Sequence, residues 1–188
     1  VVHVPLVDDE QKRVIVGADI DGENYTVDEP FLNDKQKTLL DAAKKILTPA
    51  VVQQDRSLYR ELAELSKRQG LEMSEEDFQT LCYYLERDVV HLGVLMPLFA
   101  DKKVTKIICE GIKKPVLIIR DDEMLMTSLQ FEGLDEVNAF LKHIAAKTYQ
   151  SLGFDNPILD VTYGDFRIQG TMGTDIVSSR FLATRLLS

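Results

Sequence analysis

The spacing of apolar residues predicts three consecutive helices in the first half of the chain. In each series the apolar positions recur at intervals of three or four residues, which is the period of an amphipathic helix. The first series follows Asn33 and stops at Pro49, the second ends at Gly70, and the third begins after the favourable N-cap Ser74. The three series are Leu39, Leu40, Ala43, Ile46 and Leu47; Leu58, Leu62 and Leu65; and Phe78, Leu81, Cys82, Leu85 and Val89.

A β-hairpin is predicted ahead of these helices. Two short apolar runs, at residues 14–16 and 25–27, flank Asp21 and Gly22, a dipeptide that favours a tight turn between strands. Pro30 ends the second run. We therefore expect residues 1–92 to form a hairpin followed by a three-helix domain.

The pattern changes after Gly93, and the second half predicts an antiparallel sheet with a packed helix. Runs rich in β-branched residues occur at 104–108, 116–119 and 176–177, and a turn is predicted at 111–114 before Pro115. One helical pattern extends from Leu134 to about Leu152. Its apolar face is Val137, Phe140, Leu141, Ile144 and Ala145, with Lys142 and Lys147 outside it. Residues 93–188 are thus predicted to be a second domain, and the fold class is α+β.

Composition and chain ends suggest an intracellular globular protein that is part of a longer one. Hydrophobic residues make up 45% and charged residues 28% of the chain, which is ordinary for globular domains. We expect no membrane span, because no apolar run approaches the length that one needs. The chain begins at Val1 rather than Met and ends at Ser188 after a strand-like segment, so we expect both ends to be internal boundaries.

Residue patterns that carry chemistry are missing from the sequence. It contains no GxxxxGK[ST], GxGxxG or GxSxG motif, so catalysis by this chain alone is not expected. Cys82 and Cys109 lie far apart, and the three histidines have no metal-binding spacing, which predicts buried thiols and no metal site. The formal net charge of −9 is concentrated in the first half and argues against a nucleic-acid partner.

The segment 156–188 stands out because its basic residues are all arginines: Arg167, Arg180 and Arg185. A guanidinium presents a planar fork of donors that fits phosphate or carboxylate, so this set suits an anion or an interface. The alternative is equally open: the three arginines pair with the three aspartates of the segment, at positions 160, 165 and 175. On a regular strand, Arg180 and Arg185 would point to opposite sides.

Several segments resemble, in order, the type II/IV secretion traffic ATPases, in particular archaeal secretion, pilus and archaellum members. Residues 83–101 are similar to the pattern Y-L-x-R-D-x-x-x-x-G-x-[IL]-x-P-L-[LM]-x-D, and residues 104–118 to V-x-D-I-x-x-x-G-x-x-x-P-V-x-V. Residues 156–162 resemble N-P-I-L-D-A-T, residues 167–171 resemble R-L-Q-A-T, and residues 29–34 resemble E-P-x-L-x-[DE]. The matching positions taken as structural are Tyr84, Arg87, Asp88, Gly93, Pro97, Leu98, Asp101, Gly111, Pro115, Pro157 and Asp160.

The resemblance implies the N-terminal regulatory and assembly region of a hexameric motor that powers protein secretion or filament assembly. In such motors a PAS-like N-terminal domain lies over a RecA-like domain, which uses ATP and Mg. By motif position Arg167 and Arg185, with Arg180 as a further candidate, would approach the nucleotide phosphates of the full-length motor. Implied partners are the other subunits of the hexamer and membrane platform proteins, and the implied location is cytoplasmic, at the membrane machinery.

A second hypothesis from another class is a free-standing PAS-like module that senses a small ligand, or an adaptor. Sheet-plus-helix domains of this size can hold a ligand in their core, so a sensor would require an apolar cavity with a few polar groups. The run at 83–101 favours the motor, because a sensor module does not predict it.

Overall fold

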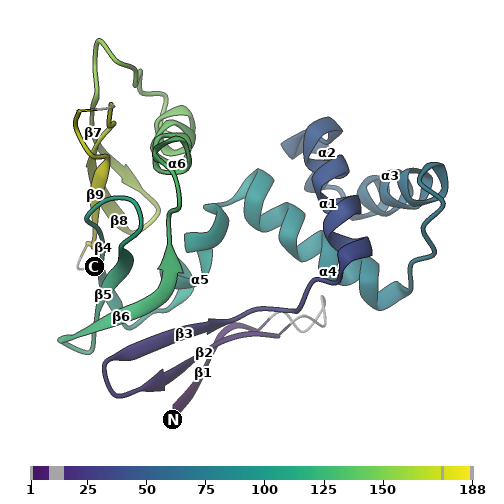
Figure 1. The fold of residues 1–188 in the computed structure, drawn as a ribbon, viewed down its shortest axis with the longest axis horizontal. Helices are drawn as coiled ribbons and strands as arrows, with labels where there is room; N and C mark the ends of the chain where they lie inside the picture. Colours follow the sequence, from purple (N-terminus) through teal and green to yellow (C-terminus); the bar gives the residue numbers. More distant parts are fainter. Residues whose placement is uncertain (1, 9–14, 175, 187–188) are drawn as a thin grey trace. The chain divides into compact units, whose positions relative to one another are not determined.

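The computed structural model describes residues 2–8, 15–174 and 176–186, and these residues have the predicted α+β fold (Figure 1). The elements in chain order are β1 Val2–Asp8, β2 Ile15–Asp21, β3 Asn24–Asp28, α1 Asp34–Ile46, α2 Pro49–Val52, α3 Asp55–Arg68, α4 Glu75–Leu85, the π-helical turn η1 Glu86–Val90, the 3-10 turn η2 Gly93–Leu95, α5 Met96–Ala100, β4 Val104–Cys109, β5 Pro115–Arg120, β6 Glu123–Gln130, α6 Leu134–Lys147, β7 Ile158–Tyr163, β8 Phe166–Thr171 and β9 Arg180–Arg185.

The chain packs as two compact units. One, which we call the sheet unit, comprises residues 1–4, 17–27 and 97–188, and the other, the helical unit, comprises residues 5–16 and 28–96. The hairpin strands are thus grouped largely with the second half of the chain. The predicted division at residues 92 and 93 stays a prediction.

The helical unit contains the three predicted helices, and their N-termini have a clear local cause. Asn33 caps α1 in a reciprocal capping box with Gln36, and Ser74 caps α4 in the same way with Asp77. The apolar faces meet in a core that includes Leu39, Leu62 and Leu81. The short helix α2 was not predicted. It begins at Pro49, whose fixed φ suits the first position of a helix.

The predicted hairpin is also present. Strands β2 and β3 are neighbours in the sheet, and Gly22 in the turn has a φ of 59°, which favours glycine. Val14, at the start of the predicted first strand, lies outside the described residues.

All nine strands of the described chain form one sheet in the order β1-β2-β3-β6-β5-β4-β9-β8-β7. In the second half, the meanders β4-β5-β6 and β7-β8-β9 meet where β4 pairs antiparallel with β9. Strand β3 joins β6 in parallel. Side chains alternate between a buried inner face and an outer face, as on a half-buried sheet.

Helix α6 covers the inner face with the predicted apolar residues, all buried. It ends at Lys147, so the predicted extension to Leu152 is wrong. Tyr149 adopts a left-handed φ of 56° and the Gln150 N–H bonds back to Ala145 O at 2.8 Å. This is a helix-terminating geometry that the sequence does not signal, because tyrosine is not a usual left-handed residue.

The predicted strand at residues 176–177 is wrong, since both residues lie in the loop between β8 and β9. Ile176 is 95% exposed, and the loop hydrogen-bonds to itself through Thr174. Its base is tied to α6 by a buried network, in which Asn138 bonds both backbone groups of Gly173 and accepts a bond from the Ser179 hydroxyl. A Cβ on Gly173 would lie less than 3.0 Å from backbone atoms of Ser179 and Val177. The loop therefore needs glycine at position 173, because the backbone of residues 177 and 179 lies close to its Cα. The strand prediction was wrong because it rested on β-branched composition alone.

Candidate functional site

The three candidate arginines do not converge on one site. Arg167 lies on β8 and Arg180 at the start of β9, both on the outer face of the sheet. Arg185, at the far end of β9, belongs to the inner side with Phe181 and Ala183. The two β9 arginines are about 16 Å apart along the strand, and they point to opposite faces as predicted.

Arg167 forms a bidentate ion pair across neighbouring strands. Its Nε donates to Asp160 Oδ1 at 2.8 Å and its NH2 to Asp160 Oδ2 at 2.7 Å, while Gln169 Nε2 donates to the same carboxylate at 3.0 Å. These bonds hold the pKa of Asp160 below its ordinary value, with the bond from Arg167 as the main cause. Both side chains of the pair are about half exposed, so a competing anion can reach the guanidinium.

Arg185 is held by the protein backbone. Its Nε donates to Val104 O at 2.8 Å, its NH2 donates to Asp101 O at 2.9 Å and to Phe99 O, and its NH1 pairs with Asp165. The guanidinium also stacks over the Phe166 ring, 4.3 Å from the centroid. This geometry fits the ion-pair alternative and a structural role.

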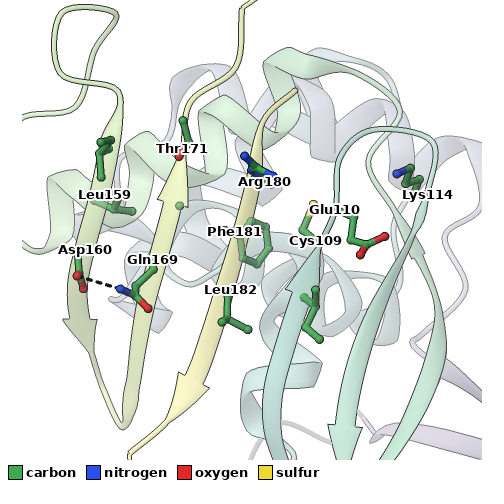
Figure 2. A pocket seen from close by; sticks show the side chains of 13 residues that line it. Cys109, Glu110, Lys114, Leu159, Asp160, Gln169, Thr171, Arg180, Phe181 and Leu182 are labelled. Carbon is green, nitrogen blue, oxygen red and sulfur yellow. Dashed lines mark hydrogen bonds between the residues drawn. The ribbon is translucent and has the colours of Figure 1, made fainter. Parts of the chain in front are cut away.

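Arg180 lines an open groove of about 580 Å³ on the outer face of the sheet (Figure 2). It is exposed, and no carboxylate of the described chain lies within 4.0 Å of it. Lys114 and Glu110 lie at the same end of the groove, with Leu182 and Gln169 further along it. The aspartate predicted as a third partner, Asp175, lies outside the described residues.

Residues 29–30 and 83–87, which belong to two segments of the resemblance, meet in the helical unit. Arg87 NH1 donates to Glu29 Oε2 at 2.7 Å, and the Tyr83 hydroxyl donates to Glu29 Oε1 at 2.5 Å. The Tyr84 hydroxyl donates to Pro30 O at 2.5 Å. The four side chains and the Pro30 carbonyl form one compact cluster, which we call the Arg87 cluster.

Burial strengthens the ion pairs and hydrogen bonds within the Arg87 cluster. The Arg87 side chain is 9% exposed, bonds Asp88 Oδ1 through Nε at 2.6 Å and stacks on the Tyr84 ring. Lys44 provides a second cation for Asp88. Burial, reinforced by the negative charge of Glu29, raises the pKa of Tyr84 to about 12. Arg87 and Asp88 lie in the π-helical turn η1, an irregularity that is often retained at functional positions.

Asp101, at the end of the same motif, joins three parts of the sheet unit. It accepts bonds from the Tyr25 hydroxyl at 3.0 Å and Arg120 Nε at 2.9 Å, and its side chain is 3% exposed. Burial and the charge of Asp101 raise the pKa of Tyr25. Sequence analysis did not single out Tyr25 or Arg120, because nothing local marks a long-range partner.

The remaining motif positions serve the backbone or the core. Gly93 and Gly111 have φ values of 59° and 133°, where glycine is favoured. Leu98 and Pro97 are buried in α5. Pro115 begins β5, and Pro157 precedes β7 and accepts a bond from Met172 N.

The part of the chain that the structure describes contains neither a cluster of metal ligands nor a membrane-spanning helix. No group of three or more His, Cys, Asp or Glu side chains is placed to hold a metal ion there. Within the same residues, every helix is too short or too polar to cross a membrane. Cys82 and Cys109 are both buried as thiols. Burial raises the pKa of Cys109, which disfavours the reactive thiolate form.

The similarities to known proteins include a relative found by sequence and a solved structure. No family model matches the chain. The uncharacterized protein MJ1288 of Methanocaldococcus jannaschii is 28% identical over 163 residues, which cover 81% of this chain. The match spans 65% of the length of that relative.

The second similarity is to a crystal structure of the VirB11 ATPase from the Brucella suis type IV secretion system in complex with sulphate. The TM-score is 0.41 at 14% identity, over 56% of this chain and 31% of the other. At this TM-score and identity, no functional residue of the VirB11 ATPase is assigned to this chain. The resemblance to type II/IV secretion ATPases therefore rests on the sequence motifs.

Proposed function

We propose that the chain is the N-terminal regulatory and assembly region of a hexameric type II/IV secretion or pilus-type motor ATPase. In this proposal the whole protein carries a RecA-like domain that uses ATP and Mg, works at membrane platform proteins from the cytoplasmic side, and powers secretion or filament assembly. The chain itself supplies positioning groups and no phosphate-binding loop.

The observation that supports the proposal is the contact between separately matched motifs. Glu29 and Pro30 belong to one matched segment, and Tyr84 and Arg87 to another more than fifty residues away. Their side chains bond directly, as expected if both segments were inherited together as one packed unit. A chance match of either segment would not predict that its charged residues pair with the other.

The arginines enter the proposal unequally. Arg167 can bind a phosphate in place of the exposed Asp160 carboxylate without disturbing the core. To do the same, Arg185 would have to break its hydrogen bonds to three backbone carbonyls and its stacking on the Phe166 ring. We therefore assign the nucleotide-facing role first to Arg167, then to the exposed Arg180. Arg185 positions the end of β9.

The sensor alternative is less well supported by the packing. A sensor needs space between the sheet and α6, and that interior holds Phe131, Phe140 and Phe181. Their ring centroids lie 4.8 to 6.3 Å apart. The groove that Arg180 lines is open and lies on the outer face instead.

The decisive experiment uses the natural full-length protein. Its sequence beyond Ser188 should contain a GxxxxGK[ST] motif, and the purified protein should assemble as a hexamer and hydrolyse Mg-ATP. Residues 1–188 alone should not bind Mg-ATP at micromolar concentration in calorimetry. A natural protein without that motif, or one without ATPase activity, would refute the proposal.

Single substitutions in the same full-length protein test the arginine roles. Replacing Arg167 by Ala should lower turnover strongly, by on the order of a thousandfold at the upper end, with poor rescue by Lys because the fork geometry is lost. Turnover per folded molecule should survive in Arg185→Ala, which should melt earlier. Unchanged turnover in both Arg167→Ala and Arg180→Ala would exclude the nucleotide-facing role.

A further inference from the structure

The outer face of the sheet carries an apolar band where a solvated face would be polar. Strand pairing aligns Met126 with Leu117, Leu117 with Ile108, and Ile108 with Leu182. These four side chains form one row across β6, β5, β4 and β9. Met124 and Ile119 extend it in the next row. We call these six residues the outer band.

The outer band is accessible in the described structure. Met124 is 56% and Met126 45% exposed, and the other four members are partly exposed. Helix α6 covers the opposite face. A contiguous apolar surface of this kind, bordered by polar residues, is typical of a site that binds another protein.

Cations border the row on both sides. Lys106 lies two residues before Ile108 on β4, and Arg180 two residues before Leu182 on β9. Because β4 and β9 are antiparallel, these offsets place the two charges on opposite sides of the row, each about 7 Å from it. Lys114 adds a third cation at the same end of the groove as Arg180, with Glu110 drawn between the two (Figure 2).

The cations have no acidic partner among the described residues, although the whole chain has a net charge of −9. Asp160 is engaged by Arg167, which leaves Glu110 as the unpaired carboxylate of the groove. With Lys106, Arg180 and Lys114 against Glu110, the border of the outer band carries more positive than negative charge on an otherwise acidic protein. This favours an acidic partner over a basic or neutral one.

We propose that the outer band binds an acidic amphipathic helix of a partner protein. Across three strand spacings the row spans about 14 Å, which is the length of about nine residues of a helix. The two bordering cations, each about 7 Å from the row, leave a space of about 14 Å between them for the roughly 10–12 Å width of that helix. The apolar stripe of the helix lies on Met126, Leu117, Ile108 and Leu182, and its flanking carboxylates face Lys106 on one side and Arg180 on the other. The inference does not depend on the proposed ATPase function.

A set of matched peptides tests the proposal with the full 188-residue chain. The probe is a fluorescein-labelled helical peptide of about 15 residues, with Leu at i, i+3, i+4 and i+7 spacing and Glu on both flanks. One control replaces every Glu by Lys, and another scrambles the order. Binding is followed by fluorescence anisotropy at low salt and at high salt.

Only the acidic amphipathic peptide should bind, and high salt should weaken its binding. The double variant Lys106→Glu/Arg180→Glu should raise its Kd at least about tenfold, and so should Met126→Glu, at an exposed position where folding is retained. The matched charge control Lys35→Glu/Arg60→Glu, in the helical unit, should leave the Kd unchanged.

Three results would overturn the inference. The first is no binding of the acidic peptide. The second is a lack of specificity, seen either as equal binding of all three peptides or as an equal rise in the Kd in the control variant. The third is a concentration-dependent dimer in sedimentation that Lys106→Glu/Arg180→Glu abolishes, because the occupant would then be a second copy of this chain.

Discussion

Replacing Arg87 by Ala should destabilise the helical unit more than almost any other single change. The substitution removes charge-assisted bonds to Glu29 and Asp88 and the stacking on Tyr84, and it leaves two largely buried carboxylates without that cation. Removal of one member of a buried ion pair costs about 3–5 kcal/mol. For a chain of this size such a loss lowers the Tm by roughly 10 °C.

Urea unfolding followed by circular dichroism at 222 nm measures this loss through the helices. Arg60→Ala is the matched control, because the Arg60 side chain is 69% exposed and its ion pair with Glu61 is long; it should cost less than about 0.5 kcal/mol. If orphaned charge causes the loss, adding Glu29→Gln to Arg87→Ala should restore part of the stability. A loss below about 1 kcal/mol in Arg87→Ala would refute the reasoning.

Three further predictions concern stability. Because the pKa of Tyr84 is raised, the Tyr84 hydroxyl keeps its proton to higher pH in the folded state than in the unfolded state. The free energy of unfolding should therefore fall as pH rises from 10 towards 12, by about 1.4 kcal/mol per pH unit for each such tyrosine. Urea titrations at several pH values should show a smaller slope for Tyr84→Phe. Gly173→Ala should cost about 2 kcal/mol in the same assay because backbone blocks its Cβ, whereas Gly153→Ala, with open space around it, should be neutral. Arg185→Ala should lose about 2 kcal/mol through its carbonyl bonds, while the exposed Arg167→Ala should leave the unfolding midpoint unchanged.

Local signals in the sequence were sufficient for the helix starts and the hairpin. Asn33 and Ser74 cap their helices through bonds to residues three positions away, and Gly22 provides the conformation that the turn requires. Such interactions lie within a few residues, so residue type and spacing predict them. The strand predicted at 176–177 failed because its loop is fixed by Asn138 and Ser179, which the local pattern does not include.

Long-range partners account for what the sequence could not predict about the candidate site. Composition left open whether the arginines bind an anion or pair with aspartates, and the outcome depends on strand register, which places Arg167 beside Asp160. Similarly, motif positions marked Arg87 but not its bond to Glu29. Strand β6 carries few β-branched residues and was missed for that reason.

The position of β9 has a consequence for how the protein is made. This strand lies between β4 and β8, although it is the last strand of the described chain. While the ribosome is still translating residues 180–185, both neighbours present unpaired backbone edges, the kind of surface that pairs with other nascent chains. Early termination or a proteolytic cut before residue 180 would therefore separate the β7-β8 pair from strands β1 to β6, rather than remove one strand from the edge of the sheet.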